Sequence, residues 1–278
     1  MNDQAAGTKV ATVGGVNIHY EDVGQGPVVV LLHGSGPGAT GRSNFVKNID
    51  YLARNFRVIC PDLPGFGKSD MKPVDAPIPG WWADQILSLL NHLEVDKAHF
   101  VGNSMGGMIT LKIALEHPAR VDRMVLMGSG GGSSIFSLFP TDGIKSLVNF
   151  YEGTGPSIEK LKNFIGQFVY DASALTDDLL QERLDAAMDP RIVAQPPMRP
   201  GLAGMPEELW RDSRLTQLPH ETLLLWGRED RVMPMDMGLI LMRQIPRCRF
   251  MVMPQCGHWV QWEHAEEFNR IVCTFLEN

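Results

Sequence analysis

The stretch Val101–Gly107 reads V-G-N-S-M-G-G and places Ser104 in a G-x-S-x-G frame. A short, apolar, β-prone run precedes it (Ala98–Val101), and a segment with apolar residues at helical spacing follows it (Met108–Glu116). An ordinary glycine-rich turn would explain the motif alone. The flanking segments instead favour a strand, a sharp turn and a helix, with glycines that let neighbouring backbone pass close to a strained serine. We therefore interpret Ser104 as a nucleophile.

Length and composition predict a globular chain with a large buried core. The 278 residues suit one domain, or one domain that carries an insertion, and 44% of them are hydrophobic. Residues 1–9 contain neither a basic region nor an apolar run, and no apolar stretch approaches the roughly 20 residues that span a bilayer. We therefore expect a cytoplasmic protein that does not enter the membrane.

Charge and cysteine usage narrow the possible partners. The formal net charge is −7 without a basic cluster, which argues against binding to nucleic acid or to anionic membranes. An anionic substrate would then need one or two local cations. The four cysteines show no C-x-x-C pair and no metal-ligand spacing, which predicts reduced thiols and no metal site. They are Cys60, Cys248, Cys256 and Cys273.

Apolar runs alternate with helical segments along much of the chain. This alternation predicts an α/β fold with a mostly parallel sheet and helices on both faces. A hairpin around Gly14 and Gly15 precedes the sheet. Besides the run before Ser104, the expected strands are 27–32, 56–60, 124–127, 222–226 and 249–253.

The pattern changes between about Phe136 and Asp212. There the β-like runs vanish and helical segments replace them, followed by a proline-rich passage. Because active sites in open α/β sheets lie beyond the carboxyl ends of the strands, we expect this insertion to cap the site. The predicted organisation is a first part of the core (1–135), a helical lid (136–212) and a second part of the core (213–278).

A glycine-rich loop, H-G-S-G-P-G (His33–Gly38), ends the run at 27–32. Its backbone N–H groups could cradle a phosphate or stabilise an oxyanion. A phosphate loop would end in Lys-Ser or Lys-Thr and lead directly into a helix, and neither feature is present. We therefore favour an oxyanion hole formed by the backbone N–H groups of Ser35 and Met105. Each such donor typically contributes roughly 3–4 kcal/mol to catalysis.

A serine nucleophile needs a base, and the base needs a group that orients it. The order Ser, Asp, His at successive strand ends points to Asp230 after the run at 222–226 and to His258 after the last strand. Glu229 also qualifies by position, but the shorter side chain at the later turn position favours Asp230. Asp62 follows an early strand, so we interpret it as a turn-stabilising residue. These residues predict a serine hydrolase and leave the scissile bond open.

Four longer motifs resemble the meta-cleavage-product hydrolases of bacterial aromatic degradation, a branch of the α/β-hydrolases. The likeness covers the chain from about Val16 to the C-terminus and is greatest to the biphenyl and dibenzofuran branch. The motifs are H-G-S-G-P-G-A-T-G-R-S-N (His33–Asn44), G-N-S-M-G-G (Gly102–Gly107), W-G-R-E-D-R-V-M-P (Trp226–Pro234) and C-G-H-W-V-Q-W-E-H-A-E-E-F-N-R (Cys256–Arg270).

The resemblance implies an α/β-hydrolase fold with a helical lid and an activity that needs no metal or organic cofactor. Members of the family hydrolyse the carbon-carbon bond next to a ketone in substrates such as 2-hydroxy-6-oxo-6-phenylhexa-2,4-dienoate, an aryl dienoate anion. The products are an aromatic acid and 2-hydroxypenta-2,4-dienoate. Such enzymes commonly form homodimers or larger homo-oligomers, so the resemblance implies self-association as well.

The resemblance also implies roles for individual residues. It assigns the triad to Ser104, Asp230 and His258, and it makes His258 the residue that moves a proton when the dienol is ketonised. For Arg183, a solvated helix charge is the competing interpretation. The implied substrate-binding residues are Gly34, Gly36, Asn44, Asn103, Phe168, Arg183 and Trp259.

One departure from the family pattern and three other functions stay open. Many relatives have glycine where this chain has Ser35, so a hydroxyl near the site could change substrate preference. A carboxylesterase or lactonase would use the same fold, and a non-catalytic ligand-binding relative is a further alternative. Haloalkane dehalogenases and epoxide hydrolases are disfavoured because they carry aspartate at the position of Ser104.

Overall fold

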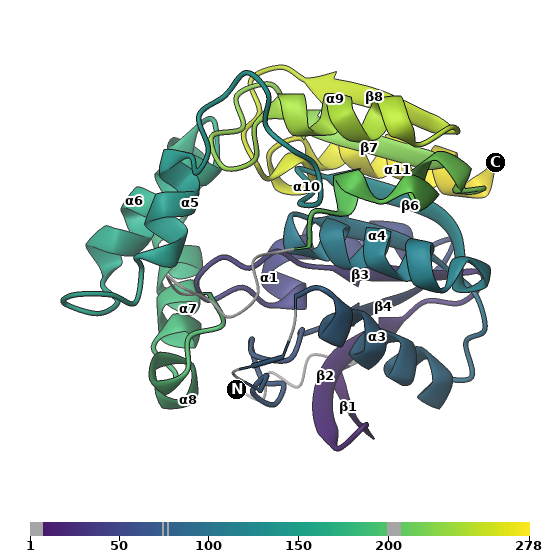
Figure 1. Ribbon diagram of the computed structural model, residues 1–278. Coiled ribbons are helices and arrows are strands. Elements are labelled where there is room, and N and C mark those ends of the chain that lie inside the picture. The colour runs from purple at the N-terminus through teal and green to yellow at the C-terminus, as the bar shows by residue number, and fades with distance from the viewer. Residues whose placement is uncertain (1–7, 74, 77, 199–206) are drawn as a thin grey trace.

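The computed structural model describes residues 8–278 except 74, 77 and 199–206. Its centre is an eight-stranded sheet in the order β1-β2-β4-β3-β5-β6-β7-β8 (Figure 1). Strands β3 to β8 run parallel to one another, whereas β2 is antiparallel to both β1 and β4. The strands are β1 (Thr8–Val13), β2 (Val16–Val23), β3 (Val28–Leu32), β4 (Arg57–Pro61), β5 (Ala98–Asn103), β6 (Val121–Met127), β7 (Thr222–Gly227) and β8 (Cys248–Met253).

Helices cover both faces of the sheet because its central strands are apolar on both sides. In β3, Val30 and Leu32 join the hydrophobic core on one face, and Val29 and Leu31 join the core on the other. The first face packs against α3 (Gly80–His92), α4 (Met105–Glu116) and α9 (Met235–Gln244). The second face packs against α1 (Gly41–Phe45), α2 (Ile49–Leu52), α10 (Val260–Glu263) and α11 (Ala265–Glu277). The predicted α/β architecture, a mostly parallel sheet with helices on both faces, is therefore confirmed.

The turn between β5 and α4 holds Ser104 in a conformation that few side chains adopt. Its backbone lies at φ 55° and ψ −114°, and it caps the N-terminus of α4. A Cβ on Gly102 would lie 2.5 Å from the Gly106 carbonyl carbon, and one on Gly106 would lie 2.1 Å from the Leu32 oxygen. Both glycines are therefore required by close backbone packing around the serine.

Between β6 and β7, the described residues form helices and no strand. They are α5 (Asp142–Val148), α6 (Ile158–Phe168), α7 (Asp177–Ala187) and α8 (Pro190–Ala194), with short 3₁₀ turns at Ala172–Ala174, Leu209–Arg211 and Ser213–Gln217. We call α5–α8 the lid helices. They stand together at one side of the sheet (Figure 1), and α5, α6 and α7 share an apolar core with Trp259 and Trp262. Part of the predicted proline-rich passage, residues 199–206, lies outside the described residues.

Candidate active site

Ser104 lies where the carboxyl end of β5 meets α4. Its backbone N–H donates to the Met127 oxygen at 2.8 Å, and its own oxygen accepts from the Gly130 N–H at 3.1 Å. These bonds tie the serine to the neighbouring strand β6 and to the loop after it. Ser104 is 7% exposed, so its hydroxyl lies in an enclosed site.

Asp230 and His258 form a buried pair on the loops after β7 and β8. The His258 Nδ1–H donates to Asp230 Oδ2 at 2.7 Å, and both side chains are fully buried. The other carboxylate oxygen, Oδ1, accepts from the N–H groups of Val232 and Met233 at 2.8 and 2.9 Å. These bonds fix the carboxylate and leave Oδ2 for the imidazole, which sets its tautomer.

The outward nitrogen of His258, Nε2, is buried and has no hydrogen-bond partner among the described residues. It is therefore available to accept a proton from a group in the site. Glu229, the alternative acid, instead accepts from the Cys256 N–H at 3.1 Å and pairs with Arg228. Of the two acids, Asp230 is the one that contacts the imidazole.

The loop after β3 is fixed by its histidine. His33 Nδ1 donates to the Gly34 oxygen at 2.7 Å, and His33 Nε2 accepts from the Leu63 N–H at 2.9 Å. Burial lowers the pKa of His33 to about 4, so the ring is neutral and can play both roles. The Ser35 N–H makes no hydrogen bond with another described residue. The Met105 N–H stands in the first turn of α4, where helical N–H groups have no partner within the helix.

Arg183 projects from α7 and is fully buried. Its Nη2 donates to the Pro37 oxygen at 2.8 Å, and its guanidinium lies 4.8 Å from the centre of the Trp259 ring. Nε and Nη1 are buried without a partner among the described residues. Burial lowers the pKa of Arg183 to about 10, against the opposing effects of Glu182 and Tyr151. The interpretation as a solvated helix charge is therefore wrong, and two donors are left for an anion.

Two asparagines that are predicted to bind substrate, Asn44 and Asn103, are buried and contact the segment 258–261 after β8. Asn44 on α1 is 3% exposed, and its Oδ1 accepts from Gln261 Nε2 at 2.6 Å, which leaves its Nδ2 for another partner. Asn103 Nδ2 donates to the backbone oxygens of Met127 and His258, both at 3.3 Å. Its Oδ1 is buried without a partner among the described residues.

The remaining predicted binding residues form the walls around these groups. The Phe168 ring lies edge-on to the His258 ring at 4.7 Å and to Trp259 at 5.4 Å. Gly34 lies against the nucleophile turn, because a Cβ there would meet the Ser104 Cβ at 3.1 Å. A Cβ on Gly36 would lie 3.1 Å from Arg183 Nη2. Aromatic rings and close-packed backbone therefore surround the polar centre.

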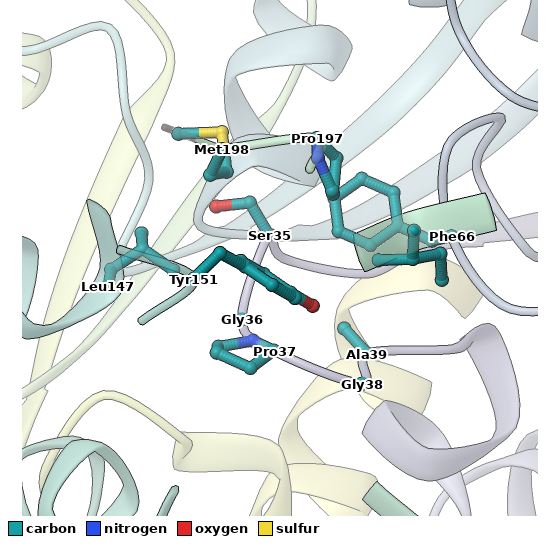
Figure 2. Close-up of a pocket in the computed structure, with 11 residues that line it drawn as sticks. Ser35, Gly36, Pro37, Gly38, Ala39, Phe66, Leu147, Tyr151, Pro197 and Met198 are labelled. Atoms are coloured by element: carbon teal, nitrogen blue, oxygen red, sulfur yellow. The ribbon is translucent and has the colours of Figure 1, made fainter. Parts of the chain in front are cut away.

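A cavity opens between the loop after β3 and the lid helices (Figure 2). Hydroxyl groups come from Ser35 and Tyr151, among otherwise apolar side chains and backbone. Burial raises the pKa of Tyr151 strongly, so its hydroxyl is neutral at ordinary pH. The cavity is lined by Ser35, Gly36, Pro37, Gly38, Ala39, Phe66, Leu147, Tyr151, Ile192, Pro197 and Met198.

Sequence reasoning missed residues that act through tertiary contacts. The motif around His33 does not reveal that this residue fixes the glycine-rich loop through both ring nitrogens. Gln261 lies 217 residues from Asn44, which it orients, and no local pattern marks that pair. Asp62 accepts from the N–H groups of Gly41 and Lys68 at 2.9 and 3.0 Å, in keeping with its interpretation as a turn-stabilising residue.

Neither a metal-binding cluster nor a membrane-spanning helix is found among the described residues. No group of three or more His, Cys, Asp or Glu side chains in 8–278, outside the gaps stated above, is arranged to hold a metal ion. None of the described helices has the length and apolar character needed to cross a bilayer.

Comparisons with known proteins place the chain in a family. The family model for the alpha/beta hydrolase fold matches residues 27–265. The chain is 46% identical over 266 residues to a 2-hydroxy-6-oxononadienedioate/2-hydroxy-6-oxononatrienedioate hydrolase of Cupriavidus pinatubonensis, covering 94% of this chain and 91% of that protein. It is 43% identical over 265 residues to a 2-hydroxy-6-oxo-6-phenylhexa-2,4-dienoate hydrolase of Burkholderia cepacia, with the same coverage of both.

Solved structures agree with the sequence relatives. The meta-cleavage product hydrolase of Pseudomonas fluorescens IP01 superposes with a TM-score of 0.85 at 36% identity and covers 97% of both chains. The 2-hydroxy-6-oxo-6-phenylhexa-2,4-dienoate hydrolase of Rhodococcus sp. strain RHA1 gives 0.84 at 33% identity over 98% of both. The chain belongs to the α/β-hydrolase family and, within it, to the meta-cleavage-product hydrolases.

Proposed function

We propose that this protein hydrolyses the carbon-carbon bond next to the 6-keto group of a 2-hydroxy-6-oxohexa-2,4-dienoate, releasing a carboxylic acid and 2-hydroxypenta-2,4-dienoate. The observation that carries the proposal is a pairing of two features. A serine on a strained turn is hydrogen-bonded to Met127 and Gly130, and a Cβ on Gly128, which lies between them in the sequence, would be 2.7 Å from His258 Nδ1 and 3.0 Å from Asp230 Oδ2 of the buried pair. Beside it stands a buried arginine with two unpaired donors, suited to a carboxylate.

In this proposal Arg183 holds the substrate carboxylate, with the Asn44 amide as a further donor at the 2-oxo end. His258 moves a proton from the 2-hydroxyl to C5, which converts the dienol into a ketone. The carbon that later leaves then has an electron sink, because its electron pair is delocalised into the newly formed ketone. Without that step, departure of a carbanion at neutral pH would be prohibitively slow.

Ser104 then attacks the 6-keto carbon while His258 takes its proton. The N–H groups of Ser35 and Met105 stabilise the oxyanion. Breaking of the C5–C6 bond leaves an acyl group on Ser104 and the hydroxypentadienoate, which takes up the proton. Water, activated by His258, hydrolyses the ester and releases the acid. The overall change is the addition of one water molecule across the C5–C6 bond.

We further propose an aryl group at C6. The cavity next to the glycine-rich loop supports this, because its lining combines Phe66, Leu147 and Met198 with neutral hydroxyls and contains no cationic side chain. Apart from Arg183, which approaches the loop at Gly36 and Pro37 and which binds the first carboxylate in this proposal, the lining offers no counter-charge to a second carboxylate, as in the nonadienedioate named for the Cupriavidus relative. The ratio of kcat/KM for the phenyl substrate over the nonadienedioate measures this preference, and a ratio below one contradicts it.

The test of the main proposal is the decay of the visible dienolate absorbance of 2-hydroxy-6-oxo-6-phenylhexa-2,4-dienoate, with identification of benzoate. Wild type and Ser88→Ala, a control on the outer part of α3, should consume the colour. Ser104→Ala should not release benzoate. Benzoate formation that persists in Ser104→Ala would contradict the role given to this serine.

A carboxylesterase or lactonase would use the same Ser104 and the same Asp230–His258 pair. The two unpaired donors of buried Arg183 favour an anionic substrate over a neutral ester. Ester turnover without any decay of the dienolate would support the alternative, and no turnover of either would support a non-catalytic binding protein. From the family resemblance we also propose a cytoplasmic homo-oligomer, whose mass light scattering would measure.

A further inference from the structure

Glu263, the last residue of α10, joins two segments that lie far apart in the sequence. Its Oε1 accepts from the Gly257 N–H at 2.8 Å, directly before His258. Its Oε2 accepts from the Tyr170 N–H at 2.6 Å, two residues after lid helix α6 ends at Phe168. One carboxylate therefore binds the backbone of the histidine loop and the backbone of the lid at the same time.

The same two segments also touch without Glu263. The His258 N–H donates to the Phe168 oxygen at 2.6 Å. A Cβ on Gly257 would lie 2.4 Å from that oxygen and 2.9 Å from the Val169 carbonyl carbon. The end of α6 is therefore packed directly on the backbone that carries the imidazole, and the Phe168 ring contacts the imidazole itself.

Lys47 lies close enough for its charge to interact with Glu263, but its Nζ donates to the Trp262 oxygen at 3.0 Å. Burial raises the pKa of the Glu263 carboxyl, against hydrogen bonds from the backbones of Tyr170, Gly257 and Trp259 and the nearby His264. Charge-assisted bonds to backbone N–H groups are stronger than neutral ones. The position of the carboxylate is set by α10, whose end it occupies, through the Glu263 N–H bond to the Trp259 oxygen at 2.8 Å.

We propose that Glu263 is a positioning residue that couples the seating of the lid at Tyr170 to the placement of His258. This inference rests on the proposed function, since it assigns His258 the proton transfers. Loss of either hydrogen bond loosens the histidine loop, because the His258 N–H bond to the Phe168 oxygen is then the remaining hydrogen bond between this loop and the lid among the described residues. The imidazole then spends less time aligned with Ser104, and the rate of the chemical steps falls while substrate still binds.

The test is a double-mutant cycle of Glu263 and Tyr170, in which each substitution has its own control variant. Glu263→Gln can accept from only one of the two N–H groups. Tyr170→Pro removes the lid donor together with the exposed tyrosine ring, so its effect is compared with that of Tyr170→Ala. The extended conformation of Val169, at φ −109° and ψ 154°, suits a residue before proline. The controls are Tyr170→Ala, which keeps the N–H, and Glu266→Gln, which removes an exposed carboxylate from the next helix.

Glu263→Gln and Tyr170→Pro should each lower kcat for dienoate hydrolysis by about 10- to 100-fold. KM should stay within about threefold of wild type, and the double variant should be no slower than the slower single variant. Hydrogen exchange should quicken in Glu263→Gln at the Gly257 amide, the Tyr170 amide or both, because the glutamine oxygen can keep only one of the two bonds. The two controls should match wild type in all these measurements.

Additive effects of the two substitutions would overturn the proposal, as would an unchanged kcat in Glu263→Gln. Unaltered exchange at both Gly257 and Tyr170 in that variant would overturn it even if Tyr170→Pro does not fold. Failure of the proposed function is distinguishable, because wild type would then leave the dienoate unchanged. In that case the same cycle, measured with p-nitrophenyl acetate, still decides whether Glu263 positions the histidine of a serine esterase.

Discussion

Replacing Arg183 with methionine should separate substrate binding from stability. The fall in the pKa of Arg183 from 12.5 to about 10, caused first by burial, corresponds to roughly 3 kcal/mol against the charged form. Because the folded-state pKa lies below the unfolded-state value, this penalty is complete below about pH 10 and applies in full at pH 7. The arginine is therefore held in the substrate-free protein at a cost in stability.

Methionine removes that penalty together with the contacts that offset it. The hydrogen bond to the Pro37 oxygen contributes about 1.5–3 kcal/mol as a charge-assisted bond, and the contact with the Trp259 ring about 1–2 kcal/mol. The flexible apolar side chain fills most of the same space. We expect the free energy of unfolding of Arg183→Met to stay within about 1–2 kcal/mol of wild type, whereas truncation of a buried side chain commonly costs about 2–5 kcal/mol.

Activity should fall far more than stability. Two charge-assisted hydrogen bonds to a carboxylate contribute at least about 3 kcal/mol together, so kcat/KM for the dienoate should drop by about 10²-fold or more. Urea denaturation measures the first quantity and initial rates the second. Arg191→Met, on exposed lid helix α8, should change neither substantially because its pair with Asp189 is at the surface. A loss of more than about 3 kcal/mol of stability, or a kcat/KM within tenfold of wild type, would refute the reasoning.

Two further substitutions test how the backbone shapes the site. In Gly128→Ala, at φ +46°, the new Cβ would lie 2.7 Å from His258 Nδ1, so kcat should fall about 10²-fold. The control Gly153→Ala also stands at a positive φ, +62°, but in open space, and it should keep wild-type kcat. In Asp236→Ala, the loop after β6 loses a carboxylate that accepts from three backbone N–H groups. Urea denaturation should show that the free energy of unfolding falls by about 2–3 kcal/mol, whereas the exposed control Asp84→Ala should change it little. Burial raises the pKa of Asp236 and the backbone hydrogen bonds lower it, with a net fall below the ordinary value. The stability that Asp236 contributes is therefore fully present above about pH 4, and it is lost as the pH falls through the lower folded-state pKa.

The sequence predicts those parts of the molecule that local patterns encode. Continuous apolar runs mark the parallel strands because both faces of the sheet are covered, as the two cores that share β3 demonstrate. The glycines around Ser104 mark the turn because no other residue fits there. Short helices such as Gly41–Phe45 escape prediction, since a helix of one turn has no periodicity to recognise.

Contacts between segments that lie far apart in the sequence cannot be predicted from local sequence patterns. In L-L-Q-E-R-L, the periodicity of α7 cannot distinguish a buried arginine from a solvated one, because burial of Arg183 depends on Pro37 and Trp259. The partners Gln261 and Asn44 are likewise set by the packing of α10 against α1. Such pairs become visible only when the chain is folded, and they determine which donors face the substrate.

The charge of the chain gives the buried arginine its significance. A protein with a net charge of −7 repels an anionic substrate at long range. Attraction must therefore act at short range, and it gains strength where water is excluded. Because Arg183 belongs to the lid and Ser104 to the sheet, a substrate held by both would fasten the lid to the core. In this position of the lid, the Tyr170 N–H donates to Glu263 and the end of α6 packs against His258. We therefore expect substrate binding and alignment of the catalytic base to be one coupled event, in which a substrate lacking its carboxylate loses kcat as well as affinity.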